Sequence, residues 1–94
     1  MKTIIAFRFT SQGQLTQVSR VMDGLLFLPP GCEVQLYEFE TLPVTHTVFN
    51  APDERMEVTL DDWVENNEPV AATIAQRLIE HGWELASEDE PELT

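Results

Sequence analysis

The sequence predicts an α+β fold, a small two-layer sandwich with helices on one face of an antiparallel sheet. Apolar residues recur at helical spacing in two segments, residues 14–26 and 69–82, and β-forming residues alternate in the segments around them. The resulting order of strand, helix, strand, strand, helix and strand is that of a ferredoxin-like β-α-β-β-α-β fold. A chain of 94 residues has room for one such domain.

The second of these helices has a start and an end that the sequence marks. Pro69 stands in the first turn, where its missing N–H costs no hydrogen bond, and Gly82 can adopt the left-handed conformation that ends a helix. Trp83 would then pack back on Leu78, and Trp83 to Leu85 would leave as a short strand. The apolar stripe consists of Val70, Ala71, Ile74, Ala75, Leu78 and Ile79.

The first part of the chain predicts a strand followed by a helix. Lys2 to Phe9 alternates and is largely apolar on both faces, which is typical of a strand in the middle of a sheet. Ser11 to Gln14 predicts a turn, and a helix should follow from about residue 14 to 26. Pro29 and the two residues after it should stop that helix. Its apolar positions are Leu15, Val18, Val21, Met22, Leu25 and Leu26.

Two further strands are predicted in the middle of the chain. Glu33 to Glu40 is rich in β-forming residues, and Tyr37 and Phe39 should share one of its two sides. Val44 to Phe49 alternates in the same way. Pro43 precedes this strand and lacks an N–H, which favours a strand that begins there or lies at a sheet edge.

The segment between the last of these strands and the main helix carries conflicting signals. Alternating apolar residues up to Val58 fit a strand, whereas Thr59 and Asp62 resemble a helical capping box with Asp in place of Glu or Gln. We therefore predict an extended segment to Val58 and one or two helical turns from Leu60 to Asn66. The alternative is an α+β fold in which residues 55–60 form another hairpin strand.

Composition places the chain among small globular proteins. We assign residues 1–87 to a single domain and expect the acidic tail, residues 88–94, to be disordered. The longest apolar run, Leu25 to Pro30, is far shorter than the roughly 20 residues that span a bilayer. Arg8 interrupts the apolar N-terminus and no cleavage site of small residues follows, so we expect no signal peptide and a cytoplasmic protein.

Charge is the outlying property of the sequence. The chain has 17 acidic and 5 basic residues and a formal net charge of −12. Residues 1–49 contribute 3 − 4 = −1, whereas residues 50–94 contribute 2 − 13 = −11. A field of that sign repels nucleic acid and anionic membrane surfaces and attracts basic proteins. We therefore expect neither direct nucleic-acid binding nor membrane binding.

No residue pattern indicates catalysis. Cys32 is the single cysteine, and without a nucleophile signature around it a lone cysteine is typically a small buried hydrophobic residue. The two histidines, His46 and His81, match no metal-binding spacing, and His81 suits the C-terminal end of a helix dipole. We therefore expect no catalytic residue, no metal site and no cofactor, and a small enzyme is only the third hypothesis.

Acidic residues recur at helical spacing between residues 54 and 68. Their intervals of 3, 4, 4 and 3 residues would align five carboxylates along one edge of a continuous helix. Their spacing of about 4.5 to 6 Å along the axis is close to the roughly 6 to 7 Å between phosphates of one strand. A strand over residues 54–58 would break the row, and a merely solubilising acidic face is the plain alternative. The residues are Glu54, Glu57, Asp61, Glu65 and Glu68.

Trp63 completes the predicted partner-binding site. It lies in sequence between Asp62 and Glu65, and an exposed tryptophan rimmed by acids resembles an interface hot spot. The leading hypothesis is a non-enzymatic protein that binds a basic surface of a nucleic-acid-binding protein or enzyme, in its narrowest form as an inhibitor that mimics nucleic acid. The alternative, from a different class, is a structural or regulatory module whose sheet pairs with a second copy to form a homodimer.

Overall fold

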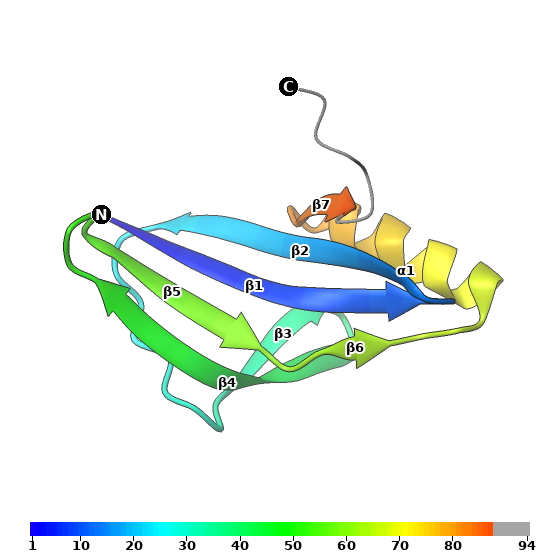
Figure 1. The fold of residues 1–94 in the computed structure, drawn as a ribbon, viewed down its shortest axis with the longest axis horizontal. Coiled ribbons are helices and arrows are strands. Elements are labelled where there is room, and N and C mark those ends of the chain that lie inside the picture. The colour runs from blue at the N-terminus through cyan, green and yellow to red at the C-terminus, as the bar shows by residue number, and fades with distance from the viewer. Residues whose placement is uncertain (88–94) are drawn as a thin grey trace.

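A computed structural model describes residues 1–87 and shows a mostly β domain (Figure 1). The acidic tail predicted over residues 88–94 lies outside this range. No helix in residues 1–87 is long and apolar enough to cross a membrane. The elements are β1 (Lys2–Ser11), β2 (Gln14–Asp23), β3 (Glu33–Tyr37), β4 (Glu40–Asn50), β5 (Arg55–Leu60), β6 (Trp63–Val64), α1 (Glu68–Glu80) and β7 (Glu84–Ser87).

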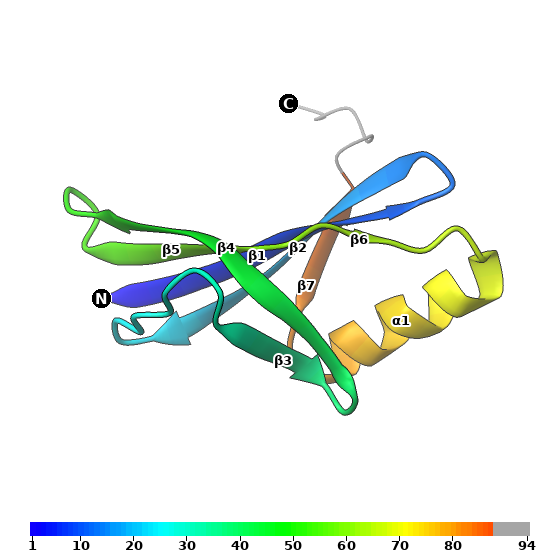
Figure 2. The ribbon, with the colours of Figure 1, turned by 90° about the horizontal axis from the view of Figure 1, so that it is seen from below.

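The strands form one mixed, curled sheet in the order β3-β4-β5-β1-β2-β7. Strand β1 lies near the middle, antiparallel to β2 and parallel to β5. Strand β6 continues alongside the end of β1 after β5 has ended. The sheet curls so that β3 and α1 lie on the same side of β1 and β2 (Figure 2). We call the side that carries α1 the inner face and the opposite side the outer face.

This architecture shows that the predicted ferredoxin-like sandwich is wrong. The described residues contain a single helix, and the segment predicted as a first helix, residues 14–26, is largely strand β2. The physical reason is the preceding turn. Gln12 and Gly13 both have positive φ, 50° and 80°, and Ser11 pairs with Gln14 across them. A two-residue turn of this kind matches the twist of a hairpin and therefore returns the chain as an antiparallel strand.

The helical turns predicted from Leu60 to Asn66 are absent as well. Residues 55–60 instead form β5, the strand considered as the alternative, and it pairs antiparallel with β4. The expected capping box does not form, because Asp62 lies between two strands and its N–H bonds to the neighbouring side chain of Asp61 at 2.9 Å. The residue that caps the helix is Asn67, whose side chain accepts from the Val70 N–H at 3.3 Å.

The main helix and its ending are confirmed. Gly82 follows α1 with φ of 89°. Its N–H donates to the Ile79 carbonyl at 3.2 Å, and the Trp83 N–H donates to the Leu78 carbonyl at 3.0 Å. These two bonds make up a Schellman motif, which satisfies the last carbonyls of the helix. Leu78 and Trp83 are both buried in the core, where the apolar contact was expected.

The core lies on the inner face and is closed by α1 and β3. Trp83 packs edge-on against Phe7 with ring centroids 5.6 Å apart, and its indole N–H donates to the Leu36 carbonyl at 3.1 Å. The buried tryptophan thus has its polar group satisfied while it joins α1, β1 and β3. The core comprises Ile5, Phe7, Phe9, Val18, Leu36, Val44, Met56, Val58, Leu60, Ala71, Ile74, Leu78 and Trp83.

Candidate partner-binding site

The predicted acidic row does not form one helical edge. Its residues follow an extended path from the β4–β5 turn, along β5 and β6, to the first turn of α1 (Figure 1). Glu54 lies in the turn with φ of 51°, Glu57 lies on β5, and Glu68 begins α1. Asp61, Asp62 and Glu65 lie in the connections before and after β6. The row is therefore drawn out, since an extended chain advances about 3.3 Å per residue and a helix about 1.5 Å.

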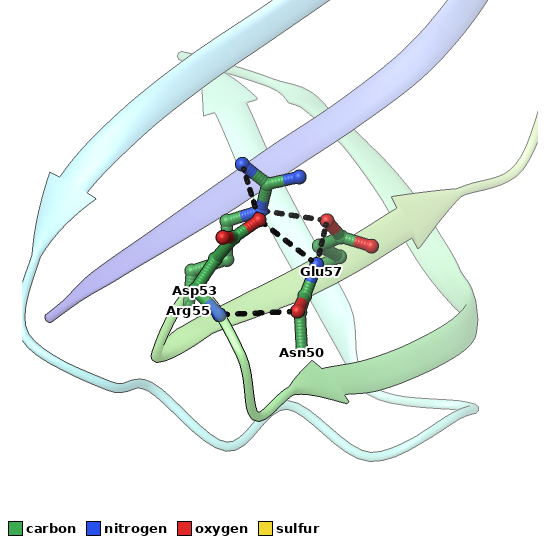
Figure 3. A network of polar contacts seen from close by, with 4 residues as sticks. All are labelled: Asn50, Asp53, Arg55 and Glu57. Atoms are coloured by element: carbon green, nitrogen blue, oxygen red, sulfur yellow. Dashed lines mark hydrogen bonds and ion pairs between the residues drawn. The ribbon is translucent and has the colours of Figure 1, made fainter.

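The end of this path nearest the β4–β5 turn is partly neutralised within the molecule. Arg55 lies 2.7 Å from a Glu57 carboxylate oxygen and 3.6 Å from one of Asp53, and Asn50 contacts both acids (Figure 3). The hydrogen bonds from Arg55 and Asn50 lower the pKa of Glu57. Glu57 thus accepts hydrogen bonds from Arg55 and Asn50, so its carboxylate is already paired within the molecule.

Asp61 and Asp62 occupy an irregularity where β5 passes into β6. Ala6 pairs with Thr59 and Phe9 with Trp63, so 63 − 59 = 4 positions on this segment face 9 − 6 = 3 positions on β1. The extra residue acts as a bulge, and bulges bend a strand and redirect its side chains. Both aspartates are exposed here. The Asp61 N–H remains bonded to the Pro43 carbonyl at 2.9 Å, which anchors the backbone.

Glu65 and Glu68 differ in what they do. Glu65 is partly buried, its carboxylate accepts from the Asn67 N–H at 3.1 Å, and its own N–H bonds to the Thr10 carbonyl at 2.9 Å. It therefore orders the approach to α1. Glu68 is exposed in the first helical turn, where the helix dipole favours a negative charge.

Four predicted site residues, Glu54, Asp61, Asp62 and Glu68, keep exposed carboxylates. Within residues 1–87, the ion pairs are those of Arg55 with Asp53 and Glu57, so none of these four carboxylates forms an ion pair. Acids arranged in this way can receive lysine or arginine side chains of another protein through charge-assisted hydrogen bonds.

Trp63 fixes this acidic connection onto the body of the domain. Its ring packs edge-on against Phe9 at 5.6 Å and stacks on Tyr37 at 6.5 Å, and the residue is only half-buried. The pKa of Tyr37 is raised by burial and by the charge of Glu40, while Arg77 acts in the opposite direction. The indole thus joins β6 to the β3–β4 hairpin and leaves part of its surface to solvent.

The hairpin also displays a residue that the sequence analysis missed. Phe39 was predicted to lie along a strand, but it lies at the tip of the β3–β4 turn with 94% of its surface exposed and φ of 72°. Glu38 and Glu40 flank it. An aromatic residue between acids in a left-handed turn has no sequence signal, because glycine or asparagine normally marks such a turn.

The residues considered for catalysis lie apart. Cys32 is near the start of β3, with its sulfur 3.8 Å from the Glu33 carbonyl oxygen. His46 is exposed on β4, and the His81 ring contacts the Arg77 carbonyl at 2.8 Å through Nδ1. In the part of the chain that the structure describes, no three His, Cys, Asp or Glu side chains converge as a metal site would require.

Comparison with protein-family models, with curated proteins and with solved structures finds no match to this chain. The class that can be stated is a small, acidic, mixed β domain with one helix.

Proposed function

We propose that this protein is a non-enzymatic binding protein that docks on a basic protein surface. The observation that supports this proposal is the connection from β5 to α1, where Asp61, Asp62 and Glu68 are exposed without a cation. Trp63 holds the connection in place and offers an apolar surface beside the charges. An aromatic anchor with charged neighbours is a common composition for the centre and rim of an interface.

Repulsion among the acidic residues of this surface favours the binding of a basic partner. Like charges about 10 Å apart, which is the length of three residues in an extended chain, repel by about 0.4 kcal/mol in water before screening, so an unneutralised series of them opposes folding. A basic partner would remove that repulsion and would be drawn to the domain by its net charge of −12. Binding of this kind is fast and sensitive to salt.

Nucleic-acid mimicry is the narrower form of the proposal. Asp62, Glu65 and Glu68 follow one another at intervals of three residues. In an extended chain such an interval is about 10 Å, which is wider than the roughly 6 to 7 Å between phosphates. Mimicry would therefore depend on the sign and density of the whole acidic surface, and the partner's groove would be one that normally holds nucleic acid.

A charge-reversal experiment tests the proposal. Proteins captured from the native lysate at low salt are purified, and their affinities for two triple variants are compared. Reversal to Lys at Asp61, Asp62 and Glu68 should weaken binding roughly tenfold or more, because each lost pair is replaced by a repulsion. Reversal at three exposed acids elsewhere, Glu33, Glu80 and Glu84, changes the net charge equally and should weaken binding much less.

Equal losses of affinity in the two triple variants would contradict a defined binding site. Binding would then depend only on the net charge of the protein. Binding that persists unchanged in high salt would contradict the electrostatic proposal altogether. Nucleic-acid mimicry predicts in addition that an excess of duplex DNA competes with this protein for the captured partner. If DNA does not compete, mimicry is contradicted, whereas the proposed binding site is not.

A further inference from the structure

Phe39, at the tip of the β3–β4 hairpin, contributes almost nothing to the packing of the domain. Its surface is 94% exposed, which is the largest fraction among the large apolar residues within residues 1–87. Single apolar residues on a protein surface are ordinary, so exposure alone does not indicate a function. Three further features set this residue apart, namely its backbone conformation, the rigid support of the hairpin and the charges beside it.

The backbone conformation of Phe39 is unfavourable for a phenylalanine. Glu38 and Phe39 form a two-residue loop, because Tyr37 pairs with Glu40 across it. Phe39 has φ of 72°, a left-handed conformation that glycine adopts readily and that crowds the Cβ of any other residue. The phenylalanine therefore lowers the stability of the turn and gains no burial in return. Strain of this kind is expected where a side chain is retained for contact with another molecule.

The hairpin holds this ring on a rigid support. Tyr37 stacks on Trp63 with ring centroids 6.5 Å apart, and its ring lies 5.9 Å from that of His81. The preceding residue, Leu36, is buried, and its carbonyl accepts from the Trp83 indole at 3.1 Å. Strand β3 is thus fixed to β6, to the end of α1 and to the core. A side chain carried by such a support loses little conformational freedom on binding.

The charge around the tip is negative. Glu38 is exposed and Glu40 is partly exposed, and neither forms an ion pair within residues 1–87. Both line a hollow of about 270 Å³ between the tip and α1, where Arg77 is the one cation, so the charges of the hollow sum to 1 − 2 = −1. The lining is completed by Tyr37, Phe39 and Thr73. A molecule that covers the tip should therefore bring lysine or arginine side chains to it.

The tip lies close to the acidic connection from β5 to α1. Phe39 is two residues from Tyr37, at most about 7 Å along the chain, and the Tyr37 ring contacts Trp63, which follows Asp62 directly. Figure 2 shows the tip at the edge of the molecule, beside the end of α1. A standard interface buries about 800 Å² on each partner, a patch about 30 Å across. One partner can therefore contact both the tip and the acidic connection.

We propose that Phe39 is the apolar anchor by which this protein holds its basic partner. The ring would enter an apolar pocket of the partner, and Glu38 and Glu40 would pair with cations at the rim of that pocket. This inference rests on the proposed function and adds the chemistry of the partner, which is a pocket for one aromatic ring within a basic surface. Aromatic anchors that fill a pocket carry a large share of the binding free energy in many interfaces.

Salt separates the anchor from the acidic site. Pairs between carboxylates and cations are screened by added salt, whereas the burial of an apolar ring is not. Loss of the ring should therefore lower the affinity by the same factor at every salt concentration. Charge reversal at Asp61, Asp62 and Glu68 should instead lower the affinity by a smaller factor as the salt concentration rises.

The dissociation constant of the captured partner, measured at two salt concentrations, tests the anchor with a matched control. Phe39→Ala keeps a Cβ and hence the backbone strain, so it removes only the ring, and it should raise the Kd roughly tenfold or more. Phe27→Ala removes the same ring from a position that is 73% exposed, within residues 24–32, which carry no charge. This control should leave the Kd unchanged. Circular dichroism should show that both variants fold.

Three outcomes would overturn the anchor. The first is a Phe39 variant that binds as tightly as the unaltered protein, the second is an equal loss in the Phe27 variant, and the third is a loss that disappears at the higher salt concentration.

The triple variant at Asp61, Asp62 and Glu68 reports separately on the proposed function. If it loses affinity and the Phe39 variant does not, the acidic site stands and the anchor is wrong. If only the Phe39 variant loses affinity, the anchor stands and the acidic site is wrong. If the protein captures no partner, both are wrong.

Discussion

The inner and outer faces of the sheet come from the same strands but have different physical tasks. Phe7 and Val18 pair across β1 and β2 on the inner face and are almost completely buried, whereas Ile4 and Val21 pair on the outer face and remain partly or largely exposed. Stability should therefore be concentrated on the side that α1 covers. The outer side contributes less burial, so substitutions there should cost less stability than substitutions on the inner side.

The largest expected effect is on the inner face. Phe7→Ala and Leu78→Ala remove side chains that are 1% and 0% exposed, and each should lower the free energy of unfolding by about 3 to 5 kcal/mol through lost burial and an added cavity. Val21→Ala should change it by less than about 0.5 kcal/mol, as for other exposed positions. Urea denaturation measures both. Similar losses on the two faces would mean that the outer face is covered in solution.

A smaller effect on stability is expected at the C-terminal end of α1, the helix that covers the inner face. Gly82→Ala should destabilise by about 1 kcal/mol, because the residue has φ of 89°. The added Cβ would lie 3.6 Å from the Arg20 guanidinium, an ordinary contact, so the cost comes from the backbone. Glu80→Ala, two positions earlier and exposed, is the control and should change little. An unchanged melting temperature for the Gly82 variant would contradict the observed helix ending.

At the tip of the β3–β4 hairpin, a substitution of Phe39 by glycine should have the opposite sign and stabilise the protein. Its φ of 72° is costly for a residue with a Cβ, and its ring is 94% exposed. Phe39→Gly should raise the free energy of unfolding by about 0.5 kcal/mol, since relief of about 1 to 2 kcal/mol outweighs the added entropy of the unfolded chain. A gain in melting temperature together with weaker partner binding would show that the ring is retained for contact. A loss of stability would mean that the ring packs more than its exposure indicates.

The smallest effect concerns pH and the contacts of Arg55. The pKa of Glu57 is lowered in the folded state, so its contribution to stability is present above the unfolded-state pKa of about 4.3 and is lost as the pH falls through the folded-state value. Arg55→Gln removes the main cause of that shift. The free energy of unfolding, measured by denaturation between neutral and acidic pH, should therefore decrease less with falling pH in the variant than in the unaltered protein. An identical pH dependence would mean that the ion pair is fully screened.

Local patterns in the sequence predicted the elements whose signals are themselves local. The strand at Lys2 and the helix stop at Gly82 were correct for that reason. Strand β2 was missed because Val18, Val21 and Met22 fit a helical stripe, whereas in the strand Val21 lies on the opposite face from the other two. The deciding feature was the positive φ of Gln12 before Gly13, and glutamine gives no warning of that conformation.

The candidate site was harder to predict because it depends on pairing between distant segments. The acidic residues stand out in the sequence, but their path in space is set by the bulge at Asp61 and Asp62 against β1. The salt bridge between Arg55 and Glu57 could not be predicted without knowing that residues 53–57 form a turn and the start of a strand. The outer face could not be predicted at all, since it exists only once β5 lies beside β1, and the paired residues Lys2 and Arg55 have a sequence separation of 55 − 2 = 53.

That parallel pairing of β1 with β5 also bears on how the chain reaches its native state. The β1–β2 hairpin has a two-residue loop and can close early, but β1 acquires its other neighbour only after β5 has joined the sheet. Until then, one edge of a largely apolar strand is open and the inner face lacks α1. Partly folded chains would therefore expose a template for strand exchange. We expect slow folding for a domain of this size, with aggregation that increases with protein concentration during refolding.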